Sequence, residues 1–109
     1  MVERGSIYIA SEKGTLTRKP RPVLIIQNER VNSFYTTVTA CLISASVSGM
    51  ANVRVLVAPT LGNGLKEPSE VQADRIVTYQ RESLDDFVGR LSPDDLRRVD
   101  LAVRRWLDL

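Results

Sequence analysis

Runs of apolar and polar residues divide the chain into short strands followed by one helix. Most of the strand signals are brief stretches of β-branched and aromatic residues bounded by Gly, Pro, Ser or Asn. The stretch from Glu70 to Tyr79 alternates only loosely, as a half-buried strand with a kink would. The predicted strands cover residues 6–10, 23–27, 36–44, 52–57, 70–79 and 87–91, with a helical turn over residues 82–86.

The C-terminal residues carry the clearest helix signal. Ser92 is a favourable N-cap, Pro93 follows at the first helical position, and two aspartates occupy the first turn. An apolar stripe then recurs with helical spacing at Leu96, Val99, Val103 and Trp106. We expect this stripe to pack on the sheet. The predicted fold class is therefore α+β and mostly β: an antiparallel sheet curled into a partly open barrel and covered by a C-terminal helix.

The length of 109 residues and the hydrophobic content of 43% indicate a single domain, 1–109, with one core. No apolar run approaches the roughly 20 residues that a bilayer-spanning helix needs. The N-terminal residues contain no apolar signal region. We therefore expect a soluble, cytoplasmic protein without a membrane partner.

The chain contains no histidine and one cysteine, Cys41, in an apolar segment. A disulfide within the chain is excluded, and a buried hydrophobic role is expected for Cys41. A catalytic cysteine would lack a histidine to activate it, and the scattered carboxylates do not form a zinc-ligand pattern. We expect no metal and no cofactor.

The net charge of +2 is unevenly distributed. Residues 1–54 carry seven Lys and Arg against three Asp and Glu, whereas residues 55–109 carry eight against ten. The first half therefore offers a candidate anion-binding face, although such clusters are also found on ordinary solvated loops.

Arg21 lies between two prolines, in the sequence Lys19-Pro20-Arg21-Pro22, directly before the aliphatic run 23–27. Proline disfavours helix in the residue before it, so Arg21 is expected at the mouth of a buried strand. A guanidinium held there is suited to binding phosphate. The alternative is a surface arginine that precedes a core strand.

The order of these segments resembles the MazF/PemK family of toxin endoribonucleases over nearly the whole chain. The resemblance rests on segments whose order and spacing are characteristic when taken together: Arg4-Gly5, Arg21-Pro22-Val23-Leu24-Ile25 with Gln27-Asn28, the hydroxyl-terminated third strand, Asp74-Arg75-Ile76 with Thr78, and Gly89-Arg90-Leu91-Ser92-Pro93 leading into Val99-Asp100. It implies an SH3-like (CcdB/PemK-type) barrel, a homodimer, metal-independent cleavage of single-stranded RNA, and neutralisation by a cognate antitoxin with a disordered acidic segment.

By this resemblance, the arginine of the family's Arg-Pro motif falls on Arg21, and its catalytic threonine falls on Ser44. An acid near the dimer groove of some members falls on Asp74. The sequence departs from the family pattern where serine replaces threonine at Ser44 and where Arg75 replaces a common glutamine. The candidate substrate-binding residues are Lys13, Thr17, Arg18, Lys19, Asn28, Ser46 and Arg75.

RNA carries its own nucleophile, the 2′-OH, so that the protein must move two protons and stabilise charge on the phosphate. Arg21 is suited to the charge stabilisation, and Ser44 to donating a hydrogen bond to a phosphate oxygen. Asp74 or Glu29 could act as base if burial or a second carboxylate raised its pKa. The alternatives are that Asp74 pairs with Arg75 or caps a turn, and that Glu29 is solvated.

Three aromatic residues, Tyr8, Phe34 and Tyr35, are candidates for stacking on bases, or for packing at strand ends. Two rival functions remain at this point. One is a CcdB-like toxin that inhibits DNA gyrase, for which Trp106 near the C-terminus is the supporting feature. The other is a barrel that binds nucleic acid without cutting it, which serine in place of threonine at Ser44 would favour.

Overall fold

The computed structural model describes residues 2–11, 19–31 and 35–109. In this part of the chain, six strands precede a single α-helix, as the sequence predicts. The elements are β1 (Ser6–Ala10), β2 (Arg21–Ile25), β3 (Thr37–Ser44), β4 (Arg54–Val57), β5 (Ser69–Gln80), the 3₁₀ turn η1 (Arg81–Ser83), β6 (Leu84–Arg90) and α1 (Pro93–Leu107).

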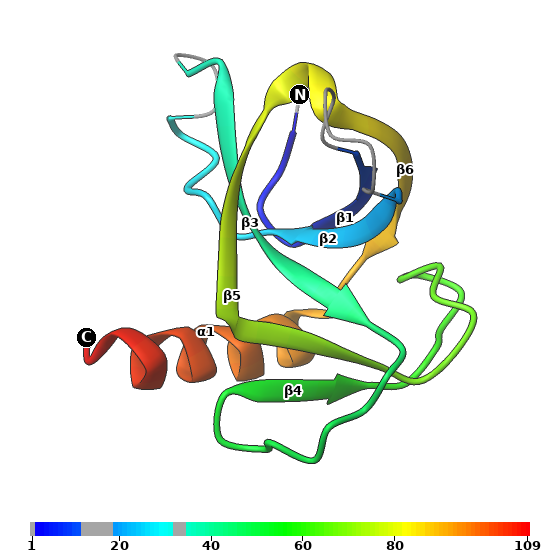
Figure 1. Ribbon diagram of the computed structural model, residues 1–109, viewed down its shortest axis with the longest axis vertical. Coiled ribbons are helices and arrows are strands. Elements are labelled where there is room, and N and C mark those ends of the chain that lie inside the picture. Colours follow the sequence, from blue (N-terminus) through cyan, green and yellow to red (C-terminus); the bar gives the residue numbers. More distant parts are fainter. Residues whose placement is uncertain (1, 12–18, 32–34) are drawn as a thin grey trace.

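The six strands form one antiparallel sheet in the order β4-β5-β3-β2-β1-β6. The sheet curls strongly, so that β1, β2 and β6 enclose one region and β4 lies beside α1 in another (Figure 1). β4 and β6 remain unpaired edges of the sheet, within the residues described. The predicted partly open antiparallel barrel with a C-terminal helix is confirmed.

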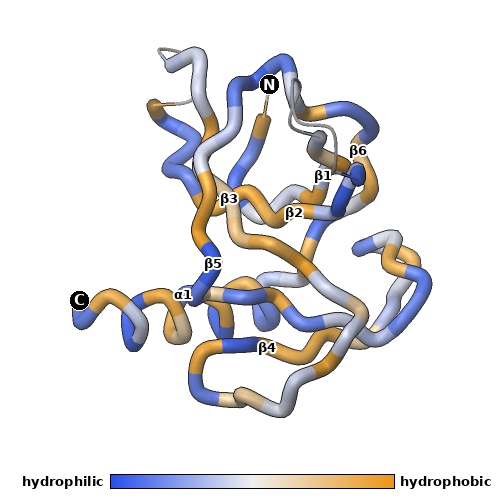
Figure 2. The backbone as a smooth tube through the Cα atoms, in the orientation of Figure 1, coloured by the Kyte–Doolittle hydropathy of each residue, from blue (hydrophilic) through white to orange (hydrophobic). Residues whose placement is uncertain are grey.

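Apolar side chains are buried on both faces of the central strands. Ile7, Leu24 and Cys41 pack in a cluster that includes Val99 of α1. Val23 and its neighbours on the opposite face form a second cluster inside the curl of the sheet. Figure 2 shows apolar colouring over the middle of β2 and β3. Strands covered on both sides have unbroken apolar runs, which explains the sequence of β2.

Cys41 is fully buried and has no disulfide, as expected from its apolar surroundings. This burial raises the pKa of the Cys41 thiol to about 12. The side chain therefore acts as a small apolar residue of the core.

A bulge bends β5 near its middle. Cys41 of β3 pairs with Ile76, whereas the next residue, Leu42, pairs with Gln72. Residues 73–75 are therefore extra residues on β5 that have no counterpart on β3. Bulges of this kind increase the local bend and twist of a strand. The kink predicted between residues 70 and 79 is confirmed, and Figure 1 shows β5 turning sharply there.

The second strand was predicted to begin at residue 23, but β2 begins at Arg21. Ala10 pairs with Arg21 and Ile9 with Pro22, while the register with β3 starts at Val23. Proline has no N–H to donate to a neighbouring strand. Pro22 is tolerated because β2 and β3 pair only from Val23 onward. Arg21 is thus the first residue of the strand and not part of the preceding loop.

The helical turn predicted over residues 82–86 and the strand over residues 87–91 are both displaced. The turn is η1, at Arg81–Ser83, and β6 follows immediately at Leu84. The Arg81 amide donates to the carbonyl of Thr36 at 2.8 Å, and β6 pairs with β1 from Leu84 onward. The sequence of residues 84–86 favours a helical turn, but their pairing with β1 makes them the start of a strand.

The start of α1 matches the predicted cap, since the Ser92 hydroxyl accepts a hydrogen bond from the Asp95 amide at 3.1 Å. The predicted apolar stripe is only partly correct. Val99 and Ala102 are the buried residues of α1, whereas Trp106 is 51% exposed. The last turns of α1 extend beyond the strands it packs on, which leaves Trp106 without a sheet to cover it (Figure 1). No helix of the described residues has the length and apolar character that a membrane span requires.

Candidate functional site

Two rows of paired residues cross β2, β3, β5 and β4 side by side. In the outer row, Ser44 lies opposite Glu70, and Glu70 lies opposite Leu56. Continuing the register of β2 and β3 by two residues places Arg21 level with Ser44. The inner row consists of Val23, Leu42, Gln72 and Arg54.

One end of the sheet brings together the two residues that the sequence analysis ranked first. Arg21 is the exposed first residue of β2, and Ser44 is the partly exposed last residue of β3. Because β2 and β3 are antiparallel, the start of one lies beside the end of the other. A guanidinium and a hydroxyl therefore share this end of the sheet.

The Ser44 hydroxyl oxygen has one defined contact. It accepts a hydrogen bond from the Ser46 amide at 3.1 Å. A hydroxyl can accept and donate at the same time, so the O–H proton of Ser44 can still be donated to another group. The arrangement suits a hydrogen bond from Ser44 to an anionic oxygen.

The Arg21 guanidinium makes no hydrogen bond or ion pair with any of the residues that the structure describes. Its five donors can bind a planar or tetrahedral anion through two oxygens at once. Lys19, two residues earlier, is also exposed. Lys19 precedes β2 and Arg21 begins it.

The other predicted substrate-binding residues are only partly brought to this end. Ser46 is exposed and adjoins Ser44 through its amide. Arg75 is exposed on the β5 bulge. Asn28 follows the opposite end of β2, where its side chain accepts from the Arg30 amide at 2.9 Å, so the structure does not group it with Arg21. Lys13, Thr17 and Arg18 lie outside the described residues.

The aromatic candidates are dispersed. Tyr8 packs against the core, and its ring meets the edge of the exposed Phe87 ring with centroids 5.6 Å apart. Tyr35 is exposed near η1, at the far end of β3 from Ser44. Phe34 lies outside the described residues. The described residues therefore do not place an aromatic cluster beside Arg21 and Ser44.

Asp74 lies on the β5 bulge and is paired with Arg54 of β4. Two parallel hydrogen bonds join them, from Nε to Oδ1 at 3.0 Å and from Nη2 to Oδ2 at 2.9 Å. Both side chains are largely buried. Such forked pairs are among the strongest polar contacts in proteins. The partner that the sequence analysis considered, Arg75, is exposed on the same bulge.

The hydrogen bonds from Arg54 hold the pKa of Asp74 below its usual range, against the opposing effect of burial. A general base near neutral pH needs the reverse, a carboxyl whose pKa is raised. The sequence analysis considered Asp74 as a base only if its pKa were raised, and in the structure its pKa is lowered. Glu29, the other carboxyl considered, is exposed beside Asn28 at the opposite end of β2.

The sequence analysis missed two members of this region, Arg54 and Glu70. Glu70 is 2% exposed, and its Oε1 lies 3.9 Å from Nη1 of Arg54. One signal was available: Arg54 interrupts an otherwise apolar strand, and Glu70, Gln72 and Asp74 recur at alternate positions. The pairing of a residue on β4 with two on β5 depends on tertiary structure, which this alternation does not specify.

Residues 3–107 match the family of PemK-like, MazF-like toxins of type II toxin–antitoxin systems. A probable endoribonuclease MazF from Mycolicibacterium smegmatis is 37% identical and aligns over 99% of this chain and 98% of its own length. Endoribonuclease MazF6 from Mycobacterium tuberculosis is 33% identical over 100% of this chain and 99% of its own. The chain belongs to this family: it is a MazF-type endoribonuclease toxin of a type II toxin–antitoxin system.

Solved structures have the same fold. The Mycobacterium tuberculosis toxin MazF-mt6 superposes with a TM-score of 0.81 at 33% identity, covering 95% of this chain and 97% of that one. A mycobacterial endoribonuclease in complex with its cognate antitoxin superposes with a TM-score of 0.83 at 24% identity, covering 100% of this chain and 97% of that one. The MazF/PemK family membership expected from the sequence is confirmed. It favours an endoribonuclease over the CcdB-like gyrase inhibitor.

Removing the Asp74 carboxylate should lower stability in a pH-dependent way. The pKa of Asp74 is lower in the folded protein than in the unfolded chain, so its stabilising effect is present above about pH 4 and is lost as the pH falls through the folded-state pKa. Asp74→Asn should lower the urea midpoint clearly at pH 7. The difference from the wild type should shrink as the pH is lowered toward the folded-state value.

Asp86→Asn is the matched control, because Asp86 is an exposed aspartate on β6. Its urea midpoint should stay close to that of the wild type at both pH values. A difference between Asp74→Asn and the wild type that is independent of pH would contradict the role given to the ion pair.

Proposed function

We propose that the protein cleaves single-stranded RNA, in the cytoplasm and without a metal ion, through attack of a 2′-OH on the adjacent phosphorus. The O2′–P bond forms as the P–O5′ bond breaks, which leaves a 2′,3′-cyclic phosphate and a free 5′-OH. The observation that carries this proposal is that Arg21 begins β2 and Ser44 ends the neighbouring antiparallel strand β3, which puts both at one end of the sheet. The absence of histidine from the sequence rules out the two-histidine version of this chemistry.

Arg21 stabilises the negative charge that develops on the phosphate. Its guanidinium is exposed and offers paired donors, so that it can contact two phosphate oxygens together. It is too weak an acid to exchange protons readily near neutral pH, and it therefore acts through charge.

Ser44 donates a hydrogen bond to a phosphate oxygen. The Ser46 amide already occupies one acceptor position of its hydroxyl, which favours this donor role. Serine retains the hydroxyl of the family's threonine, so the chemistry is preserved. Asp74 contributes indirectly in this scheme, because its carboxylate is committed to Arg54.

The approach of the RNA strand would involve the exposed cations around the site. Lys19 and Arg75 are described and exposed, and Lys13 and Arg18 belong to the same basic segment of the sequence as Lys19. These side chains contribute mainly to binding by neutralising phosphates. Ser46 and Thr17 are the neutral candidates for contacts to the same strand.

Cleavage should proceed in excess EDTA and should require the 2′-OH at one position. An RNA in which only the cleaved nucleotide carries 2′-deoxyribose should still bind but should not be cut, because the nucleophile is missing. End-labelling of the wild-type products should identify a 5′-OH and a cyclic phosphate. Cutting of the deoxy substrate, or a strict requirement for Mg²⁺, would contradict the mechanism.

Replacing Arg21 should affect catalysis more than binding. If Arg21 acts mainly in the transition state, Arg21→Ala should lower the single-turnover cleavage rate by about 10²- to 10³-fold, the scale seen when one charge-stabilising donor is removed. Arg21→Lys should recover little of this loss, since an ammonium group cannot reproduce the planar fork. Ser44→Ala should also slow cleavage, whereas Lys13→Ala should mainly weaken RNA binding.

A cognate antitoxin would cover the same cations. A mycobacterial endoribonuclease of this fold has been solved with its cognate antitoxin, and an acidic disordered segment would match the exposed Lys19 and Arg21. When RNA-binding titrations are made with the Arg21 variants, RNA and the antitoxin segment should therefore compete. Both affinities should fall as salt rises.

The cleavage rate of Arg21→Ala decides the role of Arg21. Cleavage near the wild-type rate would remove Arg21 from the active site.

The protein should form a symmetric homodimer with an RNA groove shared between subunits. Leu56 on the edge strand β4 and Leu101 on α1 are exposed and flank one hollow of the surface. An apolar pair of this kind, on a domain too small to enclose several nucleotides alone, suits contact with a second copy. Leu101→Glu should shift sedimentation toward monomer and reduce cleavage.

The control is Leu61→Glu, which changes a fully exposed leucine on the loop before β5 and should leave the dimer intact. A wild-type protein that sediments as a monomer at micromolar concentration and cleaves RNA at the full rate would contradict the dimer proposal.

A further inference from the structure

Glu70 occupies the position next to Ser44 in the outer row, on the strand between β3 and β4. It is 2% exposed, although carboxylates are rarely buried without strong partners. Glu70 takes no part in the cleavage chemistry proposed above. The burial of its carboxylate therefore has to be explained by the groups that it contacts.

The hydrogen bond that Glu70 receives comes from the segment that follows Ser44. Oε2 accepts from the Ser48 hydroxyl at 3.1 Å. Oε1 accepts no hydrogen bond from any described residue, and the nearest cation is Nη1 of Arg54 at 3.9 Å. Nε and Nη2 of Arg54 both donate to Asp74, so Ser48 is the hydrogen-bond partner that fixes the Glu70 carboxylate among the residues described.

Two serine side chains organise the segment 44–50. The Ser46 amide donates to the Ser44 hydroxyl at 3.1 Å, and the Met50 amide donates to the Ser48 hydroxyl at 3.2 Å. All side chains from residue 45 to residue 50 are exposed, so packing contributes little to their path. The path of this segment is therefore set by these hydrogen bonds and by the anchoring of Ser48 on Glu70.

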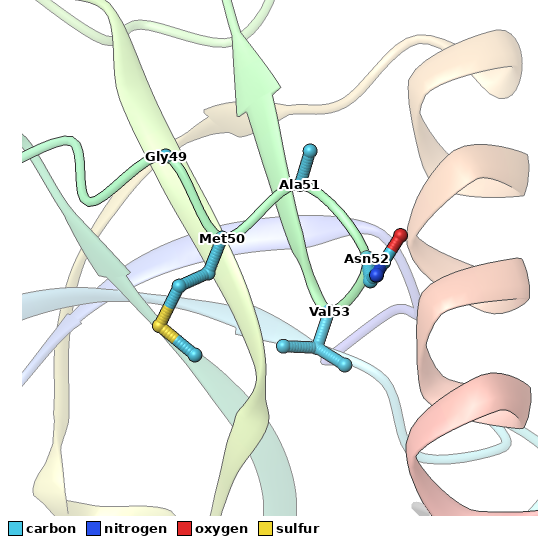
Figure 3. A pocket seen from close by; sticks show the side chains of 5 residues that line it. All are labelled: Gly49, Met50, Ala51, Asn52 and Val53. Atoms are coloured by element: carbon cyan, nitrogen blue, oxygen red, sulfur yellow. The ribbon is translucent and has the colours of Figure 1, made fainter.

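The far end of the segment is fixed separately. The Arg54 amide donates to the Met50 carbonyl at 3.0 Å, and Nη1 of Arg105 donates to the carbonyl of Asn52 at 2.8 Å. In Figure 3, Asn52 lies on the side of this turn that faces α1, and the Met50 side chain extends away from the helix. With both ends held, the Ser48–Glu70 contact decides how the middle of the segment lies against the sheet.

We propose that Glu70 and Ser48 are positioning residues for the cleavage reaction, a role that rests on the proposed function of Ser44. Glu70 holds Ser48, Ser48 fixes the course of residues 45–48, and this course keeps the Ser46 amide on the Ser44 oxygen. The Ser44 proton is thereby directed to the RNA phosphate. Arg54, paired with Asp74, places a positive charge beside Glu70 and offsets part of the cost of burying its carboxylate.

The test compares cleavage rates with RNA affinities. Ser48→Ala removes the hydroxyl that donates to Glu70, and Glu70→Leu removes the carboxylate that accepts from it. Each should slow single-turnover cleavage at saturating RNA by about 10- to 100-fold, as small misplacements of catalytic groups do. The affinity for the uncleavable deoxy RNA should stay nearly unchanged.

Ser69→Ala is the matched control, because the Ser69 hydroxyl donates its single described hydrogen bond to the backbone carbonyl of Glu67. This variant loses the same chemical group next to Glu70 and should cleave at the wild-type rate. Glu70→Val provides a second variant at the buried position. Valine suits a covered strand, so Glu70→Val should fold and still cleave slowly.

The decisive measurement repeats Glu70→Leu in the Ser44→Ala background. A residue that acts through Ser44 has no further effect once the hydroxyl is absent, so the double variant should cleave at the rate of Ser44→Ala alone. A merely structural role would lower the rate by the same factor in both backgrounds and would overturn the inference.

Two further outcomes separate this inference from the proposed function. If Ser44→Ala is slow while Ser48→Ala and Glu70→Leu cleave at the wild-type rate, the positioning role is wrong and the function of Ser44 stands. If Ser44→Ala itself cleaves at the wild-type rate, both the proposed role of Ser44 and the inference built on it are wrong.

Discussion

β5 pairs with β3 on both sides of the bulge at residues 73–75 and with β4 at its beginning, and this bulge is what allows both. The extra residues bend the strand, so that its first half lies beside β4 under α1 and its second half continues the curl of the sheet. The Ala73 amide still donates to the Val53 carbonyl at 2.9 Å, which extends the contact with the β4 side into the bulge. A straight strand could not cover both regions of the molecule.

The same bend determines the electrostatics of this region. It turns Asp74 toward Arg54 and leaves two carboxylates, Asp74 and Glu70, around one guanidinium. A largely buried pair of this kind adds little net stability compared with an apolar substitute, but it is costly to break from one side. Its main effect here is on geometry, since it fixes β4 against β5 next to the segment that follows Ser44.

The sequence predicted the parts that depend on local pattern. The stretches of β-forming residues in β1 and β3, the buried run of β2 and the Ser92 cap all have their expected structures. Arg21 and Ser44 were ranked first from motif and resemblance, and the antiparallel pairing of β2 and β3 brings them to the same end of the sheet.

What the sequence could not predict depends on contacts between distant segments. The pairing of β6 with β1 extends the last strand back to Leu84, and the length of the sheet decides that Trp106 remains exposed. Arg54 and Asp74 are twenty positions apart, and only the bulge brings their side chains together. These outcomes are set by the tertiary structure and not by the propensity of any single residue.

The burial of β2 on both faces has a consequence for how proteins of this kind can diverge. Val23 and Leu24 are fully covered on opposite sides, so a slip of one residue against β3 would place each in the wrong cluster. The same slip would change the offset between Arg21 and Ser44, so the core itself preserves the relative placement of these two side chains. The sequence between β1 and β2 lies outside this register and can change without moving a residue from one cluster to the other.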